Sequence, residues 1–169
     1  ELFSSVIFDG TYSADDNGNM SYSRFVEGLD GEWDLIGPPL HGQSIYSFIG
    51  ANSDLASQSG TAERGIGVYD NSDGSWDTYS QNDALLLSFN AGDGYQMATE
   101  TGANVEFKGN LKSGNVTKTL TYNETDPWVI DGGSRFNLVA NPYASYINAN
   151  TNADGTNCFL DSNNLSNLD

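Results

Sequence analysis

The chain has 169 residues, enough for one domain with a substantial core. Aromatic residues make up 12%, but 23 acidic residues against 6 basic ones give a formal net charge of −17. This charge disfavours nucleic acid and anionic lipid as partners. No apolar run approaches the roughly 20 residues that a membrane-spanning helix needs. We therefore expect no nucleic-acid binding and no membrane insertion.

Taken in chain order, the elements are short runs of β-branched and aromatic residues, separated by clusters of Gly, Asn, Asp and Ser. The predicted strands are Ser5–Phe8, Met20–Glu27, Glu32–Gly37, Gly65–Tyr69, Ser75–Ser80, Ala84–Phe89, Gly94–Thr99, Asn104–Lys108, Asn115–Tyr122, Trp128–Ile130 and Arg135–Ala140. Only Ile45–Ala56 favours a short helix, with Ile45, Phe48 and Ile49 on one face. The sequence predicts an all-β fold, a jelly-roll-like antiparallel β-sandwich, in a single domain over residues 1–169.

Two of these segments carry sharper expectations. ALLLSF, Ala84–Phe89, is apolar at consecutive positions, so we expect a strand that is buried on both faces in the middle of the core. NVTKTLTY, Asn115–Tyr122, alternates between apolar residues and threonine, which is typical of a strand with one face in water.

The stretch EWDLIGPPL, Glu32–Leu40, has an echo in RFNLVANPY, Arg135–Tyr143. Aligning Trp33 with Phe136 gives a constant offset (136 − 33 = 103) without a gap. We expect the two copies to form equivalent strands that end in the same turn. Most predicted strands follow the first copy, whereas only Ala144–Asp169 follows the second. We therefore expect either a fragment of a longer protein or a sheet that another segment or chain completes.

Three motifs in the second half of the chain carry a family resemblance. They are Gly94-Tyr95, the hairpin pattern F-x-G-x-L-x-x-G-x-V over Phe107–Val116, and FNLVANPY over Phe136–Tyr143. This succession resembles a recurrent module of large secreted and surface proteins of Bacteroidota, especially marine flavobacteria. The resemblance extends over residues 21–151.

The resemblance implies a β-sandwich accessory module near the C-terminal part of a multidomain protein, exported by the type IX secretion system. It also implies an extracellular or cell-surface location. No catalytic residue is attached to the module in that family. The expected partners are accordingly a glycan or a neighbouring protein subunit or domain.

The residues themselves offer little for catalysis. His41 is the only histidine, in a predicted surface turn, and a hydrolase triad needs a histidine beside its nucleophile. Cys158 is the only cysteine, and we expect a buried thiol. Glu100 and Glu106 are a candidate pair for glycoside hydrolysis, but acids near Gly and Asn are commonly turn formers. We expect no enzymatic activity.

Calcium is the one expected cofactor, because Ca²⁺ takes roughly 6–8 oxygen ligands and three loops are dense in carboxylates and amides. None of these loops matches an EF-hand, and a solvated turn is the alternative for each. The candidate ligands are Asp15, Asp16, Asn17 and Asn19 in the first loop, Asp70, Asn71, Asp73 and Asp77 in the second, and Asn152, Asp154, Asn157 and Asp161 in the third.

Glycan binding is the other expected activity. In GSWDTYSQND, Trp76 and Tyr79 lie beside Asp77, a combination that suits stacking on a neutral sugar together with hydrogen bonding to its hydroxyls. A place in the core is the alternative for Trp76, and it is what we expect for Trp33 and Trp128. The negative charge disfavours a polyanion such as alginate.

The function predicted from the sequence is therefore a non-catalytic, extracellular adhesion or glycan-binding β-sandwich module of a secreted or cell-surface protein. One alternative is a structural subunit of a surface filament, in which a neighbouring chain completes the sheet by strand addition. A second alternative is the accessory part of a polysaccharide-degrading enzyme.

Overall fold

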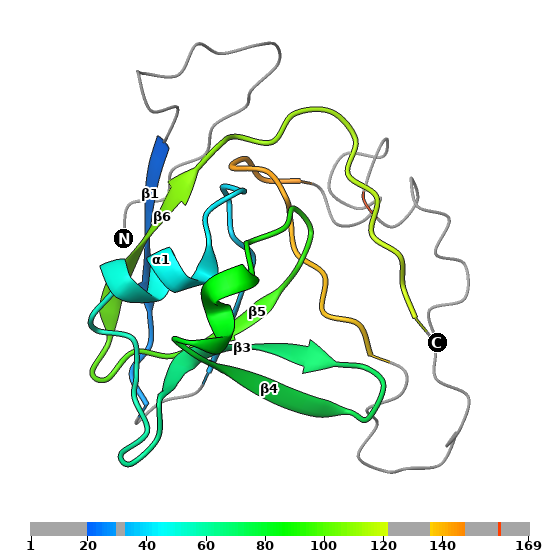
Figure 1. Cartoon of the computed structure of the whole chain (residues 1–169). Coiled ribbons are helices and arrows are strands. Elements are labelled where there is room, and N and C mark those ends of the chain that lie inside the picture. Colours follow the sequence, from blue (N-terminus) through cyan, green and yellow to red (C-terminus); the bar gives the residue numbers. More distant parts are fainter. Residues whose placement is uncertain (1–19, 30–32, 122–135, 148–158, 160–169) are drawn as a thin grey trace.

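The computed structural model describes residues 20–29, 33–121, 136–147 and 159, and all statements below concern these residues. Its elements in chain order are β1 (Met20–Val26), β2 (Asp34–Ile36), α1 (Ile45–Ala51), β3 (Glu63–Asp70), β4 (Ser75–Ser80), the 3-10 turn η1 (Asp83–Leu86), β5 (Tyr95–Met97) and β6 (Ala103–Gly109) (Figure 1). Strands β1 and β6 pair with each other, and the remaining strands form a sheet in the order β2-β5-β3-β4. Every pairing within these two sheets is antiparallel.

The predicted all-β fold with antiparallel strands is confirmed. Strand β4 has the predicted bounds, β1 ends one residue before its predicted end, and β6 extends one residue beyond the prediction at each end. The closure of the sheets into a jelly-roll sandwich stays a prediction. The predicted strands Ser5–Phe8 and Trp128–Ile130 lie outside the described residues.

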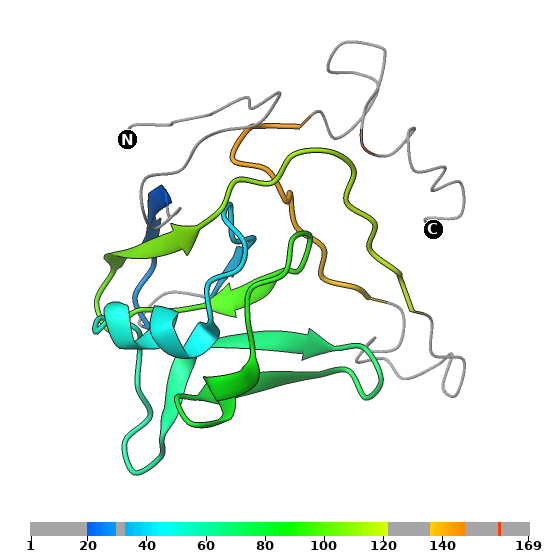
Figure 2. The same ribbon diagram turned by 45° about the horizontal axis from the view of Figure 1, so that its top comes forward.

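The predicted helix is confirmed, although it is shorter than the predicted segment. The hydroxyl of Ser44 accepts a hydrogen bond from the Ser47 backbone N–H at 3.1 Å, and so caps the first turn. Ile45, Phe48 and Ile49 are buried, as their spacing predicts. Figure 2 shows α1 beside the gap between the β1–β6 pair above and the β3–β4 hairpin below.

The strand predicted over Ala84–Phe89 is wrong. Its first residues belong to η1, where Ala84 is buried but Leu86 is 96% exposed. A 3-10 turn has three residues per turn, so most of a short apolar run must point away from the core. Phe89, after the turn, returns to the core with 2% exposure. Length and apolarity alone therefore misassigned this segment.

The echo segments do not form equivalent strands. Asp34–Ile36 pairs with β5, whereas the second copy contributes only an isolated bridge between Val139 and Asp93. The two copies nevertheless meet: a Cβ added to Gly37 would lie 2.3 Å from the Cβ of Ala140, its aligned counterpart. The expectation of two equivalent corners is therefore wrong for the described residues, although the copies are neighbours in space.

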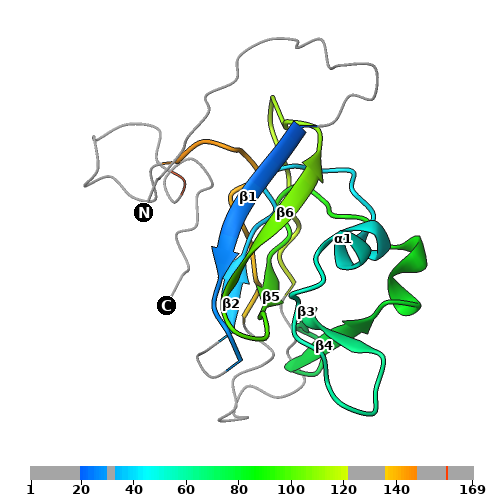
Figure 3. The same cartoon turned by 90° about the vertical axis from the view of Figure 1, so that its left-hand side faces the viewer.

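The alternating segment Asn115–Tyr122 is also not a strand over its described part, 115–121. It runs beside residues 136–147 in Figure 1. The contact between them uses side chains: Asn137 accepts a hydrogen bond from the Thr121 backbone N–H at 3.0 Å and donates one to the Thr121 carbonyl at 2.8 Å. In Figure 3 the segment 136–147, in orange, lies on the opposite side of the strands from α1.

The core lies where α1 and both sheets meet. Phe48 of α1 stacks on Phe107 of β6, with ring centroids 4.8 Å apart. It also meets Phe89 edge-on at 5.0 Å, and Phe89 meets Tyr95 of β5 edge-on at 5.0 Å. Edge-to-face and offset stacks at such distances are favourable aromatic geometries. The rings therefore join elements that are far apart in the sequence.

Two amide side chains occupy the edge of β6 that faces away from β1. Asn52, buried at the end of α1, accepts from the Glu106 backbone N–H at 2.7 Å and donates to the Glu106 carbonyl at 3.1 Å. Gln43 accepts from the Lys108 backbone N–H at 2.8 Å. The two amide side chains thus form the hydrogen bonds to the β6 backbone that a neighbouring strand would otherwise form.

We expect Asn52→Ala to destabilise the fold by roughly 2–4 kcal/mol, because it removes the partners of the Glu106 backbone in a buried position. Urea unfolding followed by circular dichroism measures the change. Ser53→Ala, at the exposed neighbouring position, is the matched control and should change stability little. An Asn52→Ala protein as stable as the wild type would contradict this role.

Candidate functional site

One face of the four-stranded sheet carries the candidate site. The strand register places Leu35, Gln96, Gly67 and Thr78 in one row that crosses β2, β5, β3 and β4. Because side chains alternate along a strand, this row faces away from buried core residues such as Ile66. We call this surface the outer face of the sheet.

Aromatic side chains flank the row. Tyr69 and Trp76 pair directly across β3 and β4, with ring centroids 5.2 Å apart and planes at 61°. Trp76 is 41% exposed and shares the outer face with Thr78, two residues along β4. Trp33, two residues before Leu35, is 40% exposed. The expectation that Trp33 belongs to the core is therefore wrong, and so is the core alternative for Trp76.

Two glycines lie in the middle of the outer face, where the chain is closely packed. A Cβ added to Gly67 would lie 2.4 Å from the Asp77 carbonyl oxygen, and one added to Gly65 would lie 2.2 Å from the Ala98 carbonyl oxygen. Neither position accepts a side chain without moving backbone. Both glycines are buried, so neighbouring segments of the chain pack closely against the backbone at these two positions.

A cavity of about 410 Å³ opens beside Trp33 and Thr78. Apolar and polar side chains mix in its wall, as is usual for small-molecule sites. The lining residues are Leu29, Trp33, Ala56, Ser57, Gln58, Ser59, Glu63, Arg64, Gly65 and Thr78. Thr78 belongs to the outer face, so the cavity and the Tyr69–Trp76 pair are adjoining parts of one surface.

The structure separates the residues that the sequence grouped with Trp76. Asp77 pairs with Val68, which packs against the core, so both lie on the opposite face from Trp76. Tyr79 is on that same face and packs against the core cluster. Burial, followed by the charges of Asp93 and Asp77, raises the pKa of the Tyr79 hydroxyl above its usual value. Tyr79 and Asp77 do not share a ligand surface with Trp76.

Tyr69 and Trp33 are the site residues that sequence reasoning missed. A signal for Tyr69 was present, because the Asp73-Gly74 turn sets the hairpin register that opposes Tyr69 to Trp76. Trp33 had no such signal. Its exposure depends on the order of the strands, in which β2 forms an edge of the sheet, and periodicity within one strand does not report that order.

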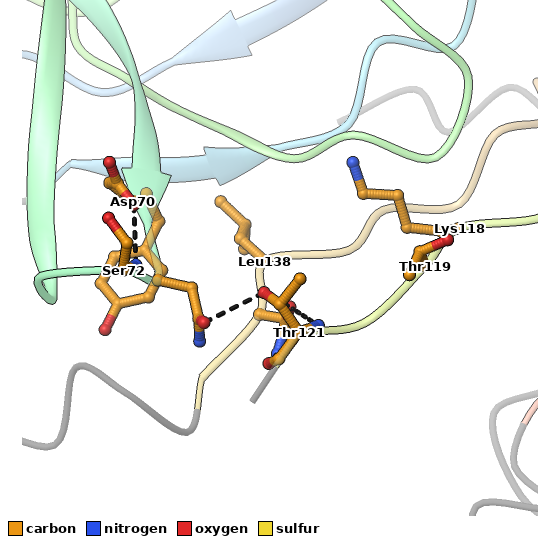
Figure 4. Close-up of a pocket in the computed structure, with 9 residues that line it drawn as sticks. Asp70, Ser72, Lys118, Thr119, Thr121 and Leu138 are labelled. Atoms are coloured by element: carbon orange, nitrogen blue, oxygen red, sulfur yellow. Dashed lines mark hydrogen bonds between the residues drawn. The ribbon is translucent and has the colours of Figure 1, made fainter. Parts of the chain in front are cut away.

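A second cavity, of about 610 Å³, lies between the β3–β4 turn and the segment 118–121, with Leu138 beside it (Figure 4). Its polar groups are largely occupied by the fold. Asp70 accepts a hydrogen bond from the Ser72 backbone N–H at 2.7 Å, and hydrogen bonds from Ser72 lower the pKa of the Asp70 carboxyl. Thr121 donates to the side-chain oxygen of Asn71 at 3.0 Å, and Lys118 forms an ion pair with Asp93.

The predicted calcium ligands are only partly described. Asp70 and Asp73 each accept a backbone N–H two residues further on, which is a turn-forming role. Within the described residues, no group of three or more His, Cys, Asp or Glu side chains is placed to hold a metal ion. The loops that contain Asp15, Asp16, Asn17, Asn19, Asn152, Asp154, Asn157 and Asp161 lie outside the described residues.

The residues considered for catalysis, His41, Glu100 and Glu106, each contact different partners. The backbone of His41 pairs with Asn110, beyond the end of β6. Glu100 accepts hydrogen bonds from the N–H and hydroxyl of Ser57, both at 2.8 Å. Glu106 forms an ion pair with Lys108 at 2.9 Å. Both carboxylates therefore have structural partners. Cys158 is outside the described residues.

Comparisons with protein-family models, with curated proteins and with solved structures find no match to this chain. Among the described residues, no helix has the length and apolarity needed to cross a membrane. The geometry of the outer face is thus the main basis for a functional proposal.

Proposed function

We propose that this chain is a non-catalytic glycan-binding module and that the outer face of the four-stranded sheet is its binding surface. The observation that carries the proposal is the exposure of Trp76 and Trp33, together with the cavity that Trp33 and Thr78 line. Exposed aromatic side chains that cluster on one surface commonly mark a site that binds a ligand or a partner.

The chemistry of this surface suits a sugar ring. A pyranose presents apolar C–H groups on its faces, which pack on an aromatic ring, and hydroxyls at its edge, which need hydrogen-bonding partners. Trp76 and Tyr69 supply the rings. Thr78 in the same row and Gln58 in the adjoining cavity supply polar groups.

The biological setting of the proposal comes from the family resemblance of the sequence. A glycan-binding β-sandwich on a secreted or cell-surface protein of the Bacteroidota type would attach a larger protein to a polysaccharide. Segment 136–147 covers part of the outer face, since Cβ atoms added to Gly37 and Gly94 would meet Ala140 and Leu138, but Trp33 and Trp76 stay exposed.

We expect Trp76→Ala to weaken glycan binding by roughly tenfold or more, because the loss of an aromatic stack of ~1.5 kcal/mol corresponds to that factor. A glycan array with neutral glucans, mannans and xylans identifies the ligand, and calorimetry gives the affinities. Tyr79→Phe is the matched control, since Tyr79 faces the core. Far-ultraviolet circular dichroism establishes that both variants are folded. Equal affinities of Trp76→Ala and wild type would contradict the proposal.

Calcium remains part of the proposal as a structural ion in at least one acidic loop. We expect Ca²⁺ to raise the melting temperature by roughly 5 °C over the value in chelator, because an ion bound only by the folded chain stabilises it. Asp73→Asn should reduce this shift if the loop after β3 is the site, and Asp54→Asn, at an exposed acid elsewhere, is the control. Identical melting in Ca²⁺ and in chelator would remove calcium from the proposal.

The second candidate function is a structural subunit of a filament. The difference between the two outer edges of the β1–β6 pair favours it. One side of β6 is occupied by Asn52 and Gln43, whereas β1 pairs only with β6 among the described residues. An open strand edge can accept a strand from another chain. Pairing of β1 with β1 of a second copy would close a two-fold dimer, so a filament requires a different donor segment.

For the filament candidate we expect oligomers that grow with protein concentration, because strand addition is an association between chains. Size-exclusion chromatography with light scattering measures the mass, and negative-stain electron microscopy detects fibres. A monomer at every concentration, with no fibres, would eliminate this candidate and would leave the glycan-binding proposal intact.

A further inference from the structure

We infer that the cavity beside Trp33 is a subsite for one anionic group of the glycan, a carboxylate or a sulfate ester, and that Arg64 is its counter-ion. This inference rests on the proposed function, since it specifies the ligand of the same surface. It concerns a single charged sugar unit within an otherwise neutral glycan.

Arg64 is the basic residue that lines this cavity, and its side chain is half-buried. The other basic side chains near acids are already neutralised: Lys108 pairs with Glu106 at 2.9 Å, and Lys118 pairs with Asp93. Among the described residues, Arg64 has no ion pair. In a chain with a net charge of −17, a half-buried guanidinium without a carboxylate partner is unusual.

A guanidinium suits a planar anion for geometric reasons. Its N–H groups form a fork that matches the two oxygens of a carboxylate, and the resulting charge-assisted bonds are about twice as strong as neutral ones. Trp33 lines the same cavity and offers an apolar surface to the sugar ring that bears the anion. Together these residues supply the two interactions that a uronic acid or sulfated sugar requires.

Nearby acids limit the site to one negative charge. Glu63 lines the same cavity, and the field of the whole chain repels further anions. Glu100, close by, is held by the N–H and hydroxyl of Ser57 at 2.8 Å, so its charge already has partners. A polyanion would therefore be rejected, while one anion beside Arg64 would be accepted.

The position of the cavity places the charged unit next to the stacked unit. Thr78 lines the cavity, and Trp76 is two residues further along the same face of β4. Two residues of a strand span about 7 Å, which is comparable to the size of one sugar ring. The anionic unit and the unit that stacks on Trp76 are therefore near neighbours along one chain.

The test compares three oligosaccharides with the same neutral backbone: one without charge, one with a single glucuronic acid unit and one with a single sulfate ester. Calorimetry at low salt measures their affinities for the wild-type chain. We expect at least one charged form to bind roughly tenfold tighter than the neutral form, because a charge-assisted hydrogen bond replaces a neutral one. The larger gain identifies the preferred anion.

Arg64→Gln should abolish this preference and keep the affinity for the neutral oligosaccharide, and Arg64→Lys should retain part of it. Arg24→Gln is the matched control, since it removes the same charge from the other sheet. Equal affinities of the charged and neutral forms for the wild type, or an equal loss in Arg24→Gln, would overturn the inference. Binding of the neutral form that depends on Trp76 would then still support the proposed function. If no oligosaccharide binds, both the inference and the proposed function fail.

Discussion

The contact between Phe48 and Phe107 is the interaction on which the rest of the fold depends. It joins α1 to the β1–β6 pair, and Phe89 and Tyr95 extend the same cluster to the four-stranded sheet. Both sheets are small, so neither could bury its apolar face without this shared centre. The amide of Asn52 lies one turn of helix beyond Phe48 and bonds to the Phe48 carbonyl at 2.8 Å, so the helix that carries the central ring is also attached to β6.

This centre gives the two sides of the four-stranded sheet different surroundings. One side carries Ile66, Met97 and Tyr79 into the core, and its composition is fixed by packing. The other side carries Trp76 and Tyr69, whose rings meet across β3 and β4, and it also carries Gln96, which is buried. The exposure of Trp76 on this side is the observation on which the proposed binding surface rests.

The spacing of apolar residues along the sequence predicted most elements, because helices and strands each have a characteristic side-chain period. The hairpin of β3 and β4 follows from alternation about Asp73-Gly74, and α1 follows from the spacing of its apolar residues. The apolar pattern failed to predict burial where the exposure of a residue depends on the arrangement of the elements in the fold. Leu86 is exposed because η1 makes only one turn, and Trp33 is exposed because β2 is an edge strand.

The same distinction explains the candidate site. Trp76 could be proposed from sequence because it lies in a polar context, but Tyr79 and Asp77 were grouped with it by proximity along the chain. Neighbours at odd spacing in a strand point to opposite faces, and the true partner, Tyr69, comes from the adjacent strand. A site on a sheet is assembled across strands, so its members are separated in sequence by the turn between them.

The two buried glycines of the outer face have a consequence for how the proposed binding surface could diversify. Gly65 and Gly67 admit no side chain, so these two positions cannot be altered without moving Ala98 or Asp77. New specificities can therefore arise only at the rim, through residues such as Trp33 and Arg64 that do not support the core. Selection for a different ligand and selection for a stable fold would act on separate sets of residues, which makes this sheet a suitable scaffold for directed evolution.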